Sequence, residues 1–222
     1  MSTGPAALGT AQEHAVAALR RLVSTGALGP GARVNQEELA ARIGLSVAPV
    51  REALRTLEQE GQLTYRPRRG YVVTELRISD LEEIYALRAL LEGRAARHAL
   101  PGLDAAALAR VAAAAEQCAA AAEAGDVMGE LAANRRLHFG LLDAPDRPHA
   151  MRVIRLLWDS TEAYRARYYA DPAERRHASR AHARILAAAR AGDADRLVAE
   201  LDAHRERALT VLRAVLASPG SS

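Results

Sequence analysis

The residue types that are scarce in this chain limit the folds that it can adopt. Its 222 residues include one cysteine, one phenylalanine and one tryptophan, whereas alanine supplies much of its hydrophobic half. A single cysteine excludes an internal disulfide, and Cys118 shares helical spacing with Val111 and Ala114, which predicts a buried thiol. Because alanine favours helices and strands need β-branched and aromatic residues, the composition predicts a mainly α fold.

Two further absences concern location and charge. No run of about 18 apolar residues occurs, and no charged-then-apolar leader opens the chain. We therefore expect a soluble, cytoplasmic protein with no membrane partner. The chain has no lysine: all 30 basic residues are arginine, which we attribute to coding bias, and the net charge of +3 permits an anionic partner without requiring one.

The first third of the chain has the pattern of a winged helix-turn-helix. After a disordered tail at 1–10, helices are expected at 12–26, 36–43 and 47–60, with glycine-containing connections. The stretch "QLTYRPRRGYVVTEL" indicates two strands around an arginine-rich turn, which would be the wing. Residues 11–75 are thus predicted to form a DNA-binding domain of three helices and a β-hairpin.

The remainder, beyond a linker at 76–79, has helical periodicity throughout. Residues 80–217 are predicted to form an all-helical domain for ligand binding and dimerisation. Its six expected helices cover roughly 79–99, 104–124, 126–142, 147–169, 172–190 and 193–216.

Side chains suited to DNA occur on the third helix and on the wing. Ser46 is placed to cap that helix, and Arg51 and Arg55, four residues apart, share one face. The major groove admits one α-helix, and arginine suits guanine or phosphate. The wing offers Arg66, Arg68, Arg69 and Gly70 to phosphates or to the minor groove. The alternative is an ordinary solvated helix face on which these arginines pair with neighbouring glutamates.

Residues 11–75 resemble the winged helix-turn-helix of the GntR family of bacterial transcription regulators. The resemblance rests on "PGARVN", "EELA", "GLSVAPVREALRTLEQEG" and "RRGYVV". It implies a DNA-binding regulator, most often a repressor. The family usually has arginine directly after the serine, where this chain has Val47, and Arg42 or Arg51 is expected to compensate. A homodimer is expected on a palindromic operator, because each winged domain reads one half-site.

Three of the seven histidines lie on apolar stripes of three different predicted helices. His138 shares its stripe with Asn134 four residues earlier, and His182 and His204 lie among alanine, leucine and isoleucine. Burying three unpaired imidazoles is costly, and one divalent ion would satisfy all of them. The alternative is that each histidine makes a separate hydrogen bond in the core or lines a pocket.

The helical half resembles the FCD ligand-binding domain, in its shorter, VanR-like version, from "ISDLEEIYALRALLEGRAARHA" onward. Metal-binding members use a carboxylate four residues before a histidine and then two later histidines. The resemblance therefore implies a site made of Asn134, His138, His182 and His204. Zinc is expected, with nickel or manganese as alternatives. An amide replaces the carboxylate, which lowers the expected affinity and occupancy.

Two arginines border core stripes and suggest an effector. An arginine on a buried stripe needs an anion, so Arg88 and Arg165, with Tyr168 nearby, are predicted to bind a small carboxylate such as a hydroxy- or dicarboxylic acid. The alternative is an ion pair between helices, with Glu92 or Glu162 as the partner.

Two other functions compete with an effector-controlled regulator. A helical metal-dependent hydrolase could use the three histidines, but no buried Asp or Glu near them is evident as a general base. An effector-independent DNA-binding protein would leave the pocket-facing polar residues unexplained. We expect a regulator that is not an enzyme.

Overall fold

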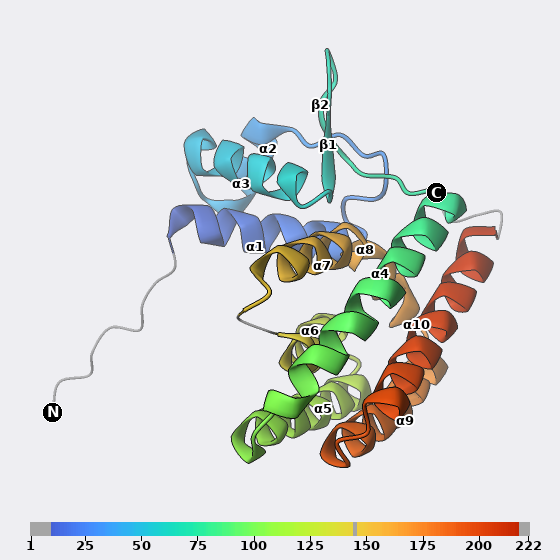
Figure 1. Ribbon diagram of the computed structural model, residues 1–222. Helices are drawn as coiled ribbons and strands as arrows, with labels where there is room; N and C mark the ends of the chain where they lie inside the picture. The colour runs from blue at the N-terminus through green and yellow to red at the C-terminus, as the bar shows by residue number, and fades with distance from the viewer. Residues whose placement is uncertain (1–9, 144–145, 218–222) are drawn as a thin grey trace, which may run out of the picture. The chain divides into compact units, whose positions relative to one another are not determined.

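The computed structural model describes residues 10–143 and 146–217 (Figure 1). The chain divides into two compact units, residues 1–75 and 76–222. The tail expected at 1–10 lies outside the described residues except for Thr10, which caps the first helix. The linker expected at 76–79 is shorter than predicted, because Ile78 already begins a helix.

The first unit contains α1 (Ala11–Ser24), α2 (Gln36–Ile43) and α3 (Val47–Gln59). Asn35 caps α2 by accepting the backbone N–H of Glu37 at 3.0 Å, and Gly44 ends it with a φ of 68°. Helices α1 and α3 pack together through fully buried aliphatic side chains, including Leu19, Val50, Leu54 and Leu57. The apolar face of each helix is therefore buried in this core, and its polar face is exposed.

The hairpin β1 (Leu63–Arg66) and β2 (Gly70–Val73) is antiparallel, with Leu63 opposite Val73. Its turn places Arg68 at a φ of 66° and Gly70 at 76°, and glycine adopts this left-handed region without steric cost. The connection between α1 and α2, which was expected to contain only turns, also pairs with β2. The Val34 N–H donates to Tyr71 O and the Val73 N–H to Ala32 O, both at 2.9 Å.

The second unit has one α-helix more than the six expected, within the part of it that the structure describes. The expected helix at 147–169 is two helices, and a short 3₁₀ turn, η1, follows the first helix. The elements are α4 (Ile78–Ala99), η1 (Leu100–Gly102), α5 (Ala105–Ala124), α6 (Val127–Leu142), α7 (Pro148–Ser160), α8 (Glu162–Tyr168), α9 (Pro172–Arg190) and α10 (Ala194–Ala217).

The break between α7 and α8 falls at buried Thr161, which has φ −108° and ψ 8°. Its hydroxyl donates toward the Leu157 and Trp158 carbonyls, at 3.1 and 3.2 Å. Arg165 Nη1 also donates to Trp158 O, at 2.7 Å. These side chains satisfy carbonyls that a continuous helix would use, so the chain can turn here without unpaired backbone groups.

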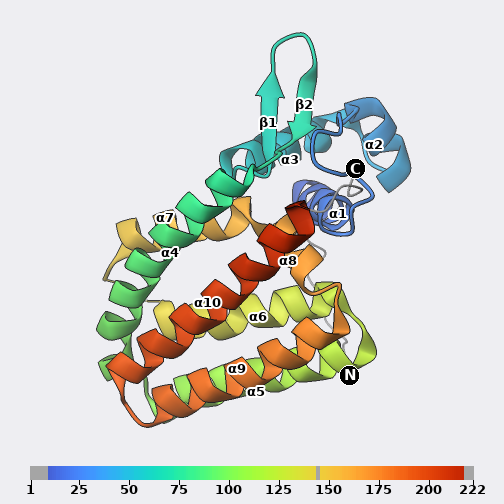
Figure 2. The same cartoon turned by 90° about the vertical axis from the view of Figure 1, so that its right-hand side faces the viewer.

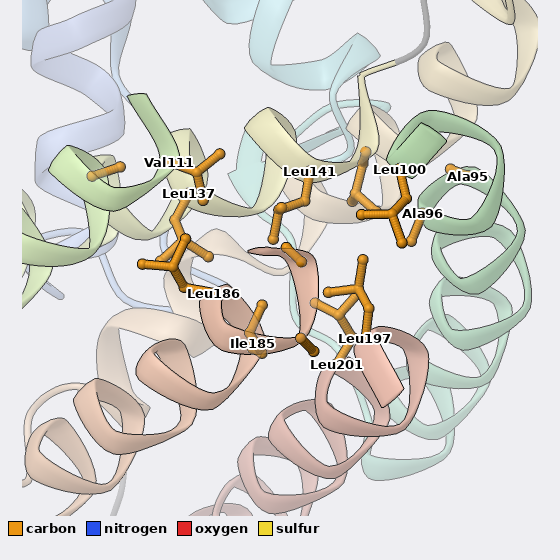
Figure 3. Packing of buried hydrophobic residues seen from close by; sticks show 14 of the residues in the cluster. Ala95, Ala96, Leu100, Val111, Leu137, Leu141, Ile185, Leu186, Leu197 and Leu201 are labelled. Atoms are coloured by element: carbon orange, nitrogen blue, oxygen red, sulfur yellow. The ribbon is translucent and has the colours of Figure 1, made fainter. Parts of the chain in front are cut away.

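The core of the second unit lies between its long helices. Helix α5 packs along α6 and α9, and α10 packs along α4 and α9 (Figure 2). Leu137 and Leu141 of α6 belong to one buried cluster with Ile185 of α9 and Leu201 of α10, and Figure 3 shows residues of this cluster between the helices. Cys118 is buried and forms no disulfide, and its burial is what its spacing predicts. No helix in the described part of the chain is both long and apolar enough to cross a membrane.

Candidate DNA-binding surface and metal centre

Helix α3 carries two of the predicted DNA contacts on its exposed side. Arg51 and Arg55 are exposed, whereas Ala53 and Leu54 between them are buried. The two arginines differ, however. Arg55 Nη1 pairs with Glu52 Oε1 at 2.9 Å, as the solvated-face alternative predicts, whereas Arg51 makes no ion pair with any described residue. Ser46 occupies the N-cap position, but its hydroxyl makes no capping hydrogen bond, contrary to expectation.

The wing and the end of α2 add further exposed arginines. Arg66, Arg68 and Arg69 are all exposed around the hairpin turn, next to half-buried Gly70. Arg42 is exposed near the end of α2 and lines a hollow of about 230 Å³ with Arg33 and Glu38. Sequence reasoning missed Arg33, because it treated residues 26–35 as a connection and did not anticipate the pairing of this segment with β2.

In the second unit, α6, α9 and α10 bring His138, His182 and His204 together. One ring nitrogen from each histidine lies within 4.8 Å of the other two. The ring centroids are 4.9 to 5.7 Å apart, and all three side chains are buried. Helical spacing could predict the buried face of each residue, but only packing brings the three faces to one point.

Several polar atoms at this point have no hydrogen-bond partner. They are both ring nitrogens of His138 and His182, Nδ1 of His204 and Oδ1 of Asn134. Burial lowers the pKa of His182 to about 4. Burial also lowers the pKa of His138 and His204 well below its usual value, and the neighbouring histidines with Arg88 and Arg205 lower it further. The imidazoles are therefore neutral near pH 7, which is the form that binds metal.

A cavity of about 20 Å³ adjoins the histidines. His138, His204 and Asn134 line it, and so do all three residues predicted for an effector, Arg88, Arg165 and Tyr168. His182 is not among its lining residues. A cavity of this size has room for about one water molecule or ion. The separate predictions of a metal site and an anion site therefore refer to adjoining positions in the structure.

The arginines around the cavity differ in their partners. Arg88 Nε donates to Glu92 Oε1 at 2.7 Å, so the predicted ion-pair alternative holds for Arg88, although within α4 and not between helices. Arg165 is buried with its Nε unpaired, and its Nη1 binds Trp158 O and Thr161 Oγ1. Burial and then repulsion by Arg88 lower the pKa of Arg165 to about 10, so it is still charged near pH 7.

Glu92 and Arg205 are two buried charged residues of this region that the sequence prediction did not include in a site. Fully buried Glu92 accepts hydrogen bonds from Arg88, Trp158 Nε1 at 2.8 Å and Arg205 Nη1 at 2.7 Å. Burial opposes ionisation of Glu92, but the two arginines outweigh it and keep its pKa below the usual range. Arg205 directly follows His204 in the sequence, and this adjacency could have indicated that Arg205 lies near the histidines.

A winged helix-turn-helix with exposed arginines, joined to a helical unit built around buried histidines, defines a two-domain DNA-binding protein. Residues 11–73 match the gntR family of bacterial regulatory proteins, and residues 83–207 match the FCD domain. The chain belongs to the GntR family, in its FCD-containing branch, and is a DNA-binding transcription regulator.

Similar proteins carry the same description. An HTH-type transcriptional regulator of the TAR-I ttuE-ttuC' intergenic region of Agrobacterium vitis is 36% identical over 54% of this chain and 72% of its own length. The regulator McbR of Escherichia coli is 33% identical over 63% of each chain. The solved structure of E. coli McbR/YncC superposes with a TM-score of 0.81 at 28% identity, covering 94% of this chain and 100% of that one.

Proposed function

We propose that this regulator is a homodimeric repressor that binds a palindromic operator and releases it when a small carboxylate binds the helical domain. The observation that carries the DNA-binding part is the series of exposed arginines on α3 and the wing. Arg51 is the primary candidate for a base contact, because it has no ion-pair partner among the described side chains. Arg42 and Arg33 would supply DNA contacts that Val47, which stands where the family usually has arginine, cannot make.

The DNA-binding proposal is tested with gel shifts on the promoter of an adjacent gene. Arg51→Ala should cost about 1–3 kcal/mol if it contacts a guanine. Arg68→Ala or Arg69→Ala should weaken binding to all sequences evenly and lower the salt slope by about 1. Arg21→Ala, on the exposed face of α1, is the matched control. Unchanged binding by an Arg51/Arg55 double variant would contradict the assignment of α3 as the recognition helix.

For the helical domain, the donor set fits a divalent ion. Three neutral imidazoles and an amide oxygen, all buried and mostly without hydrogen-bond partners, form a set of N and O ligands that suits zinc, nickel or manganese. His138, His182 and His204 would hold the ion with Asn134 beside them. When bound, the ion would supply a positive centre for an anionic oxygen donor.

Metal content is measured by elemental analysis after mild dialysis. Wild type should retain about one ion per chain, and a variant with His138, His182 and His204 all changed to alanine should retain none. His149→Ala, an exposed histidine, is the control. Equal metal content in the triple variant and wild type would show that the ion binds elsewhere.

The effector proposal rests on the excess of positive charge around the cavity. Arg88, Arg165 and Arg205 are all buried, and buried Glu92 pairs with Arg88 and Arg205. Half-exposed Asp202 also pairs with Arg205, so these ion pairs contain one carboxylate fewer than the three arginines. A carboxylate ligand would offset this excess and could accept a forked contact from Arg165, whose Nε is unpaired.

Two alternative functions are weaker. A metal-dependent hydrolase needs a free general base, and both oxygens of Glu92 already accept hydrogen bonds from Arg88, Trp158 and Arg205. An effector-independent DNA-binding protein gives no role to the buried polar cavity. Hydrolytic activity that depends on the bound metal would favour the first alternative.

A further inference from the structure

A groove runs between α4 and α10, next to the cavity at the histidines. The two helices are antiparallel neighbours, because Arg97 pairs with Asp195 at one end and Glu82 pairs with Arg213 at the other (Figure 1). The groove between them has a volume of about 560 Å³. Pockets that hold small organic ligands usually measure about 300–1,000 Å³. The groove can therefore hold a ligand that the cavity of about 20 Å³ excludes.

Two buried residues belong to both the groove and the cavity. Tyr85 of α4 and Arg205 of α10 line the groove, and they also line the cavity. Each residue is only 4% exposed, and Arg205 Nε has no hydrogen-bond partner. A buried N–H without a partner is costly, and a ligand that accepts a hydrogen bond from it would offset that cost. These two side chains therefore form the wall between the groove and the cavity.

Arg205 is the part of this wall that can move. Its Nη1 donates to buried Glu92 Oε2 at 2.7 Å, and its Nη2 pairs with Asp202, whose side chain is 49% exposed. Asp202 lies one turn earlier on α10. If Arg205 turns outward toward Asp202, it keeps one carboxylate partner, while Glu92 keeps Arg88 and Trp158 as donors. Rotation of one side chain would thus join the groove to the cavity without leaving a buried charge unpaired.

The inner end of this path suits a carboxylate. Arg165 lines the cavity, is 6% exposed and has no hydrogen-bond partner at Nε. Its guanidinium carbon lies 4.5 Å from the centre of the Trp158 ring, which also lines the cavity. The aromatic contact holds the face of the guanidinium, so its N–H edge is left for an anion.

The outer end of the path suits an uncharged group. The groove has an apolar lining that includes Ala86, Ala89 and Leu209. Apart from Arg205, its charged lining residues are Glu82, Asp202, Glu206 and Arg213. Arg213 already pairs with Glu82 at 2.9 Å and lies 3.6 Å from Glu206. The carboxylates outnumber the remaining arginine, so they would repel a second carboxylate of a ligand.

We propose that the groove between α4 and α10 is the entrance to the effector site and holds the body of the effector once Arg205 has turned toward Asp202. The effector is then a monocarboxylate with an uncharged apolar body of several carbon atoms. Its carboxylate binds Arg165, and its body lies along Ala89 and Leu209. The inference rests on the proposed function for the carboxylate in the cavity, and it adds the route of entry and the chemical class of the ligand.

Fluorescence of Trp158 tests this arrangement, because the only tryptophan of the chain lines the cavity. The full chain is titrated with acetate, hexanoate and adipate in the absence of DNA. Each methylene buried in the groove is worth about fourfold in affinity, so hexanoate should bind at least about tenfold more tightly than acetate. Adipate has as many carbon atoms as hexanoate but carries a second carboxylate, so it should bind more weakly than hexanoate.

Two variants test the groove and its wall separately. Ala89→Phe fills the groove and should remove the advantage of hexanoate over acetate, whereas Ala109→Phe, at an exposed position of α5, is the control and should keep it. Arg205→Gln shortens the wall and should increase the quenching of Trp158 by neutral acrylamide. Arg184→Gln, which removes a half-exposed ion pair with Glu200, is its control. Circular dichroism checks folding, and the Ala89→Phe comparison decides the matter if Arg205→Gln does not fold.

Each outcome has one meaning. No fluorescence response to any of the three acids, equal affinities for acetate and hexanoate, or an advantage of hexanoate that survives Ala89→Phe would overturn the groove as the binding site of the body. Adipate binding as tight as that of hexanoate would overturn the chemical class, and unchanged quenching in folded Arg205→Gln would overturn the wall. Acids that bind as expected but do not release the operator would contradict the proposed function and leave the groove assignment intact.

Discussion

At the scale of single residues, Asn134 sets the charge of the proposed metal centre. Its Oδ1 is buried without a hydrogen-bond partner, and it lines the same cavity as His138 and His204. Three neutral imidazoles and an amide contribute no negative charge. An ion bound there would keep its full charge, which favours an anionic ligand and weakens retention by the protein.

Asn134→Asp should tighten metal binding about tenfold or more, equivalent to about 1.4 kcal/mol, because it adds a negative ligand of nearly the same size. Competition with a chromophoric chelator measures the affinity. Asn134→Ala is the matched loss of a ligand and should weaken binding. If Asp and Ala at this position have the same affinity for metal, the side chain does not contact the ion.

A second residue-scale prediction concerns Glu130, which is buried on α6 without a hydrogen bond to its carboxylate oxygens. Burial raises its pKa to about 7, although Arg175, at 3.8 Å, acts against this rise. The unfolded carboxyl titrates near about 4.3. Between these pH values the unfolded chain releases a proton that the folded chain keeps, so this group lowers stability as pH rises, by up to about 4 kcal/mol.

Glu130→Gln removes this ionisation and should therefore stabilise the protein relative to wild type near about pH 8, with little difference near about pH 4.5. Urea unfolding of the metal-free proteins at both pH values measures the effect. The histidines titrate in both proteins, so their contribution cancels in the comparison. Glu116→Gln, which is exposed, should show no such pH-dependent difference. A constant difference at the two pH values would contradict the raised pKa.

At the scale of elements, close packing between helices decides where side chains fit. Helices α5 and α6 approach at Gly140, where an added Cβ would lie 2.8 Å from Val111 Cγ2. Val111 is buried and β-branched, so it cannot rotate away easily. The α5–α6 pair therefore depends on the missing side chain at this position.

Gly140→Ala should destabilise the protein by about 1–3 kcal/mol through overpacking, even though alanine is the better helix former by about 1 kcal/mol. Thermal or urea unfolding measures the change. Gly102→Ala is the control, because nothing lies within 4 Å of its added Cβ. A net stabilisation by Gly140→Ala would show that α5 and α6 separate easily at this point.

At the scale of the whole molecule, the proposed effector site is linked to the start of the helical domain. The cavity is lined by residues from α4, α6, α7, α8 and α10, and its size of about 20 Å³ is too small for an organic acid without movement of these helices. Buried Tyr164 on α8 neighbours Arg165, and its hydroxyl accepts the Leu76 backbone N–H at 2.7 Å. Movement of α8 would therefore reach the first residue of this unit.

An effector that acts through this contact should shift operator affinity about 5–150-fold in wild type, the usual range for allosteric coupling. Tyr164→Phe should keep effector binding but reduce this shift, because the phenyl ring cannot accept the hydrogen bond. Fluorescence polarisation of labelled operator, titrated with hydroxy- and dicarboxylic acids, gives both quantities. Arg88→Ala, Arg165→Ala and added chelator should weaken effector binding itself. An undiminished shift in Tyr164→Phe would contradict this route.

The sequence by itself determined the elements and the family. Periodicity, caps and turn residues act over a few neighbours, so α2, the winged unit and the buried faces bearing His138, His182 and His204 could be predicted. Only the tertiary structure decided what distant residues do together. Thr161 and Arg165 end α7 by donating hydrogen bonds to its carbonyl groups. Glu92 pairs with both Arg88 and Arg205, although Arg205 lies 113 residues farther along the chain. Such choices depend on which helices pack together and on burial, because a buried charge must find a partner wherever the fold provides one.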